Sequence, residues 1–184
     1  MSLMQTLTAH LMTEAEFLRL PDYGRKWELV NGGVKEVPTS FLHDPIVFLL
    51  SQLLGPFLRG RGGISLGQAG FRMRGGNVRV PDLSFTRRER LPGGSVPNTF
   101  GEAAPDLCVE IISPSEDRAD MACKVEEYFA SGAVLVWHIF PDTQTVLVFT
   151  SPAHSITLNA GDTLTGGDLL PGFSCHVADL FVLD

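Results

Sequence analysis

The 184-residue sequence lacks the features of a membrane or secreted protein. No apolar run reaches the ~18 residues that are needed to span a bilayer. The N-terminus has neither the positively charged start nor the apolar stretch of a signal peptide. We therefore predict a cytoplasmic protein with no membrane partner.

Cysteine is scarce, and its pattern argues against two kinds of stabilising site. Cys108, Cys123 and Cys175 are widely spaced and form no C-x-x-C pair. No two histidines lie at the spacing of metal ligands. A disulfide scaffold or a zinc site does not fit this pattern, and three reduced thiols are expected.

Three common enzyme signatures are absent as well. The sequence contains no serine nucleophile elbow, no P-loop and no dinucleotide fingerprint, which argues against an esterase, an NTPase and an oxidoreductase. The composition is that of an ordinary globular protein, with 44% hydrophobic and 19% charged residues. Length and composition together predict one domain over residues 1–184, with residues 1–11 as a flexible N-terminus.

The charge is unevenly distributed along the chain. The formal net charge is −7, yet residues 59–90 contain eight arginines and only two acidic residues, a local charge of +6. Such a basic segment can contact the phosphates of a nucleic acid, and Arg72, Arg74 and Arg79 are the candidate contacts. The alternative is that these arginines lie on solvated loops and strand edges.

Hydrophobic periodicity and turn residues predict an α/β fold, with a mixed sheet flanked by helices. A capping box of Thr13 and Glu16 begins the first helix, and Asp44 is the expected N-cap of the second. A turn is expected at residues 21–24 and a mobile surface loop at 91–104. The expected helices cover residues 14–20, 45–59 and 117–131. The expected strands cover residues 27–30, 34–37, 64–66, 70–73, 78–85, 107–112, 134–140 and 145–149.

Glu110 lies in the most apolar of these strands, residues 107–112, which is expected to be central and buried on both faces. An unpaired carboxylate there would cost several kcal/mol, so Glu110 must be paired, protonated or bound to a metal. We favour a metal ligand, and the alternative is a structural pair with an arginine.

A second acid must approach Glu110 if the two are to share a metal ion. Asp106 is four residues earlier on the same strand, so its Cα is roughly 13 Å away. Asp82 lies on a different strand, and if the two strands are neighbours their lateral spacing is only about 4.8 Å. Pro81 marks a strand edge or a bulge, where side chains are often redirected. Asp82 is therefore the preferred partner.

Lys124 is the third candidate. It is three residues after Met121 and four before Tyr128, so it flanks the core face of the helix that follows the Glu110 strand and can reach back to the two acids. The alternative is a lysine whose stem packs on the helix while its ammonium stays in water. His43, just before a helix, is more typical of a capping or surface residue.

Together with the motifs around them, these residues resemble those of the Uma-type restriction endonuclease family, which is assigned to the PD-(D/E)XK nuclease superfamily. The combined order of the motifs is specific, and the resemblance covers about residues 12–182. The matching motifs are residues 12–17, 27–32, 81–85, 105–115, 124–128 and 170–173.

The resemblance implies a restriction-endonuclease-like core and a metal-dependent endonuclease that hydrolyses nucleic acid, most often DNA. Asp82 and Glu110 would be the metal-binding acids, with Mg²⁺ or Mn²⁺ also bound by the carbonyl of Ile111. The superfamily motif places a lysine two residues after the acid, where this sequence has Ile112, and the resemblance implies that Lys124 replaces it.

Glu28 also matches a family motif position, as a further ligand or a hydrogen-bonding support. Two alternatives to a nuclease stay open: a non-catalytic nucleic-acid- or partner-binding module of the same fold, and a hydrolase of another phosphodiester. The 91–104 loop and the short edge strands further predict a homodimer, in which each protomer addresses one strand of a duplex.

Overall fold

The computed structural model describes residues 11–20, 26–37, 42–67 and 69–182. The expected turn at 21–24 and nearly all of the expected flexible N-terminus lie outside these ranges. Within them, no helix is long and apolar enough to cross a membrane.

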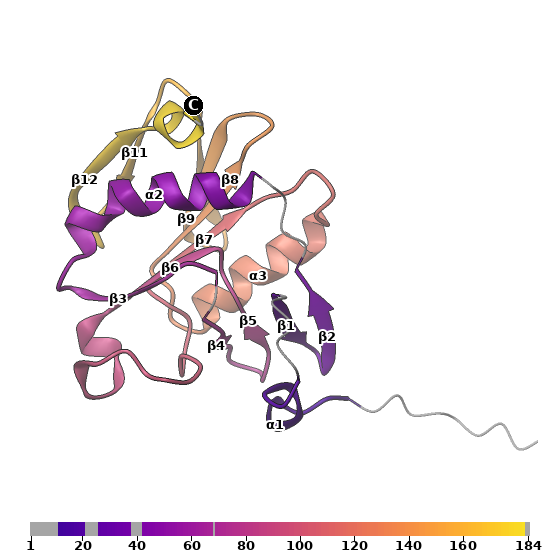
Figure 1. The fold of residues 1–184 in the computed structure, drawn as a ribbon. Coiled ribbons are helices and arrows are strands. Elements are labelled where there is room, and N and C mark those ends of the chain that lie inside the picture. The colour runs from indigo at the N-terminus through magenta and orange to yellow at the C-terminus, as the bar shows by residue number, and fades with distance from the viewer. Residues whose placement is uncertain (1–10, 21–25, 38–41, 68, 183–184) are drawn as a thin grey trace, which may run out of the picture.

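A six-stranded mixed sheet forms the centre of the fold (Figure 1). β7 and β8 are parallel, and the other neighbouring pairs are antiparallel. β7 lies between β6 and β8 and is buried at every residue, so the expectation of a central strand buried on both faces is confirmed. In sheet order the strands are β10 (His154–Leu158), β9 (Thr145–Ser151), β8 (Leu135–Phe140), β7 (Leu107–Ile111), β6 (Leu83–Arg87) and β3 (Gly62–Ser65).

Alternate residues of β7 pack against different helices, because successive side chains of a strand point to opposite faces. Leu107, Val109 and Ile111 join the core under α2 (His43–Leu58). Cys108 joins the core under α3 (Arg118–Ala130). The two helices therefore cover opposite faces of the sheet (Figure 1). Glu110 lies on the face of α3, where it contacts two side chains of that helix.

The C-terminal part of the chain extends the core under α2. A two-stranded sheet of β11 (Thr163–Gly166) and β12 (Leu170–His176) precedes a 3-10 helix, η3 (Val177–Phe181). Phe173 of β12 stacks on Trp137 of β8 with ring centroids 5.9 Å apart, which ties this hairpin to the large sheet.

A second, antiparallel sheet lies beside α3 (Figure 1). In order it contains β2 (Gly33–Glu36), β1 (Trp27–Val30), β5 (Val78–Arg79) and β4 (Phe71–Arg72). The single strand expected over 78–85 was wrong, because the chain leaves this sheet after β5 and enters the large sheet at β6. Pro81 has no amide hydrogen to donate to a ladder, which suits a corner between two sheets.

Two helices differ in detail from the sequence prediction, one at its end and one at its start. The capping box of Thr13 and Glu16 is present, but α1 (Glu14–Phe17) ends earlier than expected. α2 begins at His43 with Leu42 as its N-cap, so Asp44 lies inside the first turn and does not cap the helix. The 88–104 segment contains two short 3-10 helices, η1 (Arg88–Arg90) and η2 (Pro92–Gly94).

Candidate active site

Asp82 lies at the corner between the two sheets, and the main chain of β7 holds it there. Its amide donates to the Val109 carbonyl at 3.0 Å, and its Oδ2 accepts the Ile111 amide at 2.7 Å. The ladder pairs Leu83 with Val109, so the next opposed positions are Asp82 and Glu110. Asp82 directly precedes β6, and β6 is a neighbour of β7, as expected of the segment that contains Asp82. We call Asp82 and Glu110 the acid pair.

Glu110 is buried, with 2% of its surface exposed, and two side chains of α3 compensate it. The Tyr128 hydroxyl donates to Oε1, and the Lys124 ammonium lies 3.4 Å from Oε2. Burial, followed by the charge of Glu110, raises the pKa of Tyr128 well above its usual value, so the phenol stays protonated and remains a donor. The carboxylate is therefore paired, as its burial required.

Lys124 is buried, with 3% exposed, and the alternative of a lysine with its ammonium in water does not fit this structure. Its Nζ bridges Glu110 and Glu28, whose Oε1 is 3.5 Å away. Burial lowers the pKa of Lys124, but the charges of Glu110 and Glu28 outweigh it, so the pKa is raised overall. The two carboxylates therefore favour the protonated, cationic form of Lys124.

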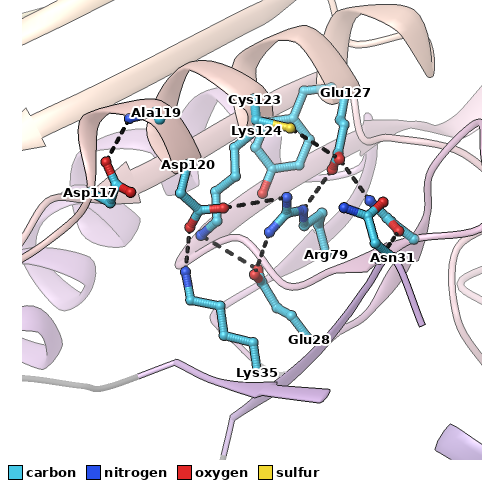
Figure 2. A network of polar contacts seen from close by, with 12 residues as sticks. Glu28, Asn31, Lys35, Arg79, Asp117, Ala119, Asp120, Cys123, Lys124 and Glu127 are labelled. Carbon is cyan, nitrogen blue, oxygen red and sulfur yellow. Dashed lines mark hydrogen bonds and ion pairs between the residues drawn. The ribbon is translucent and has the colours of Figure 1, made fainter. Parts of the chain in front are cut away.

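Glu28 is held by the main chain and by Arg79 (Figure 2). The Val80 amide donates to Oε1 at 3.1 Å, and Arg79 Nη1 donates to Oε2 at 2.9 Å. The same guanidinium donates from Nε to Glu127 of α3 at 2.6 Å. Glu28 thus supports Lys124 from the small sheet, next to the acid pair.

Arg79 does not occupy the position that was expected of a phosphate contact. Its side chain is 0% exposed and is enclosed by carboxylates. Burial lowers its pKa, but the hydrogen bond to Glu127 and the charge of Glu28 outweigh that effect, and the pKa rises. A guanidinium so placed organises the acids around it and has no surface to offer to DNA.

An outer ring of polar contacts surrounds this network (Figure 2). Lys35 of β2 pairs with Asp120 of α3, and Arg79 Nη2 lies 3.7 Å from the same carboxylate. Burial raises the pKa of Asp120, but the hydrogen bond from Lys35 and the charge of Arg79 have the larger effect, so the pKa is lowered overall. Asn77 donates to Glu127 at 2.7 Å. These contacts fasten the small sheet to α3.

Other arginines of the basic segment also form internal ion pairs. Arg87 and Arg90 lie 2.8 and 3.1 Å from buried Asp106. Arg72 pairs with Glu14 and Glu102, each at 2.7 Å. Four of the eight arginines of the segment are therefore occupied by ion pairs, while the other four are exposed: Arg59, Arg61, Arg74 and Arg88. The ion pairs with Arg87 and Arg90 also show what Asp106 does: this acid, which was rejected as the partner of Glu110, binds two arginines instead.

Arg74 and His43 have different surroundings. Arg74 is exposed in the turn between β4 and β5, where its amide donates to Ser131. His43 is buried at the start of α2, which does not fit a surface residue.

The sequence reasoning overlooked three residues near the acid pair. Lys26 Nζ lies 2.6 Å from Asp82 Oδ1, and Tyr128 contacts Glu110 as described. His138 of β8 is opposite Glu110 in the parallel ladder, and burial lowers its pKa to about 4. Signals for two of them existed: Lys26 is two residues from Glu28 on one strand face, and Tyr128 is one helical turn from Lys124.

The donor atoms around the acid pair suit a hard divalent cation. Among the residues that the structure describes, no three His, Cys, Asp or Glu side chains are grouped so that they could hold a metal ion. The protein's share of a shell would be the acid pair and the Ile111 carbonyl, which points to the same side as its amide and thus toward Asp82. Two carboxylates with water and substrate oxygens are typical of Mg²⁺.

Comparisons with known proteins agree with the resemblance described above. The model of the Uma2 family, described as "Putative restriction endonuclease", matches residues 14–178. A crystal structure of "a putative nuclease belonging to DUF820" from Anabaena variabilis ATCC 29413 superposes with a TM-score of 0.82 at 23% identity. The match covers 92% of this chain and 97% of the other, so the two share a fold. No curated protein matches significantly.

Proposed function

The chain belongs to the Uma2 family of putative restriction endonucleases, and from this premise we propose that it is a divalent-metal-dependent endonuclease that hydrolyses phosphodiester bonds in DNA. The observation that supports the proposal is the position of the acid pair: Asp82, directly before β6, is opposite Glu110 of β7, and the buried Lys124 lies beside Glu110. Two acids and a lysine are the groups that the family resemblance requires, and here the lysine comes from α3.

Asp82, Glu110 and the Ile111 carbonyl would hold the metal, Mg²⁺ or Mn²⁺. A bound divalent cation supplies an activated water and stabilises the negative charge that develops on the phosphate. The protein holds the ligands in place, since the Ile111 amide fixes Asp82 and the Tyr128 hydroxyl fixes one oxygen of Glu110.

Lys124 would stabilise negative charge in the transition state or orient the attacking water. Its pKa is raised by the charges of Glu110 and Glu28, which fits a role as a cation that stabilises negative charge. Glu28 and Arg79 act as positioning residues, because Glu28 pairs with the ammonium and Arg79 in turn holds Glu28.

DNA would be held by surface cations outside the buried network. Arg74 is the best placed of the three arginines considered, and Arg72 would contribute only after loosening its pairs with Glu14 and Glu102. We further propose a homodimer, since β3 and β10 are the outer strands of the large sheet and Ile64 of β3 is exposed. Light scattering measures its mass directly.

One observation favours a second candidate, a non-catalytic nucleic-acid- or partner-binding module. Both members of the acid pair already have an ammonium beside them, Lys26 and Lys124, so their charges are balanced without a metal. Such a module would bind DNA equally well with or without divalent ions.

A plasmid-nicking assay separates the two candidates. The wild type is expected to nick supercoiled DNA with Mg²⁺ or Mn²⁺ and not with EDTA, and Asp82→Asn and Glu110→Gln are expected to be at least ~100-fold slower. Glu126→Gln, an exposed acid of α3, is the matched control and should retain activity. Metal-independent DNA binding with no nicking would refute the nuclease and support the module. Faster turnover of a small phosphodiester than of DNA would indicate a different substrate.

A further inference from the structure

Lys26 occupies a position that no role described so far explains. It directly precedes β1, and its carbonyl accepts the Val37 amide at 2.9 Å, which extends the β1–β2 ladder to this residue. Its ammonium lies 2.6 Å from Asp82 Oδ1, and the two side chains are only 7% and 8% exposed. This is a buried ion pair on one of the two carboxylates that the proposed metal needs.

β1 delivers opposite charges to the two halves of the site. Lys26 and Glu28 are two residues apart, so they project from the same face of the extended chain. Lys26 reaches Asp82, while Glu28 reaches Lys124 and Arg79. The strand therefore places the Lys26 ammonium beside Asp82. It also places the Glu28 carboxylate beside Lys124, the lysine that pairs with Glu110.

Three carboxylates and three cations lie in mutual contact around the acid pair. They are Glu28, Asp82 and Glu110, with Lys26, Arg79 and Lys124. A divalent cation bound by Asp82 would lie beside the Lys26 ammonium in a poorly solvated volume, and the repulsion between the two cations is unfavourable unless the lysine leaves. Arg79 and Lys124 each contact more than one carboxylate, whereas the ion pair described for Lys26 is with Asp82 alone.

We propose that Lys26 and the divalent metal exchange at Asp82. Without metal, the Lys26 ammonium neutralises Asp82 and keeps the buried carboxylate in place. When the metal binds, Lys26 leaves Oδ1 and its ammonium becomes accessible to solvent. The exchange rests on the proposed function, because it assumes that Asp82 is a metal ligand.

Mn²⁺ binding to the full chain tests the exchange without measuring activity. Lys26→Met keeps most of the alkyl stem and removes the competing ammonium, so calorimetry is expected to show Mn²⁺ binding at least about tenfold tighter than in the wild type. Lys35→Met is the matched control. It removes another lysine of the β1–β2 hairpin, whose partner is Asp120 of α3 and not a member of the acid pair. Its Mn²⁺ affinity should equal that of the wild type.

The two proposals fail differently in this experiment. Equal or weaker Mn²⁺ binding by Lys26→Met, with normal binding by the wild type, overturns the exchange and leaves the metal site standing. No Mn²⁺ binding by the wild type or either variant overturns the metal-dependent nuclease, and the exchange with it.

A second measurement uses the wild type and does not depend on a folded variant. An amine-acetylating reagent, read by mass spectrometry, should modify Lys26 slowly without metal and several-fold faster with saturating Mg²⁺. Lys35, whose side chain is 43% exposed, serves as the internal reference and should not change. Continued protection of Lys26 in the metal-loaded protein overturns the exchange.

Discussion

Replacing Lys124 with methionine tests the site most directly. Methionine keeps much of the apolar stem but removes an ammonium that lies 3.4 Å from Glu110 and 3.5 Å from Glu28. Glu110 would keep only the Tyr128 hydroxyl, while Glu28 would keep Arg79. Because a buried charge then loses its partner, we expect the free energy of unfolding to fall by roughly 3–5 kcal/mol.

The pH dependence of unfolding gives this prediction a second readout. The pKa of Lys124 is raised in the folded protein, so its stabilising contribution is complete below the unfolded pKa of about 10.4. That contribution is lost as the pH rises toward the higher folded value. The difference in stability between the wild type and Lys124→Met should therefore be constant near neutral pH and shrink at alkaline pH above about 10.4.

Urea denaturation at several pH values and the nicking assay together decide the outcome. Lys124→Met should also be roughly 100-fold slower in nicking, the scale of a lost electrostatic stabiliser. Lys35→Met, the control with an exposed lysine, should cost less than about 1 kcal/mol and leave the rate unchanged. A stability change below about 0.5 kcal/mol for Lys124→Met, the value typical of a surface lysine, would refute the buried bridge.

Three further changes give distinct outcomes. Tyr128→Phe removes only a hydroxyl and should lower the free energy of unfolding by about 1.5–3 kcal/mol in urea, because the hydrogen bond is to a charged group; no measurable loss would contradict that bond. Wild-type stability should fall by up to about 3 kcal/mol between pH 6.5 and 4, because the pKa of His138 is lowered to about 4, and His138→Gln should flatten that fall. Arg74→Ala should weaken DNA binding, reduce its salt dependence by about one counterion and leave stability within ~0.5 kcal/mol; an unchanged salt slope would remove Arg74 from the DNA surface.

Local pattern was sufficient to predict the parts of the fold that depend on neighbouring residues. The continuous apolar run of β7 predicted its central, buried position. The spacing of Met121, Lys124 and Tyr128 predicted that Lys124 would turn inward, because helical periodicity fixes which residues share a face. Glu110 could be identified as an exception because a carboxylate in such a strand needs a partner.

Features set by distant residues could not be predicted in the same way. The basic segment looked like a phosphate-binding surface, yet Arg79 pairs with Glu28, fifty-one residues earlier, and with Glu127. Alternation along the strand places Lys26 on the same face as Glu28, but its ion pair with Asp82 depends on how two distant segments meet. The corner at Pro81 also depends on two sheets meeting, which the pattern of one segment does not reveal.

That corner makes the acid pair sensitive to how the two sheets dock. Val78–Arg79 belongs to the small sheet and Leu83–Arg87 to the large one, so only three residues connect them across Asp82. If the small sheet separated from α3, it would carry away Lys26, Glu28 and Arg79 together, and Asp82 would lose its cation while Lys124 lost one of its anions. A local opening of four short strands would thus dismantle the site while leaving the central sheet intact, and amide exchange in β1 and β5 would report how often that happens.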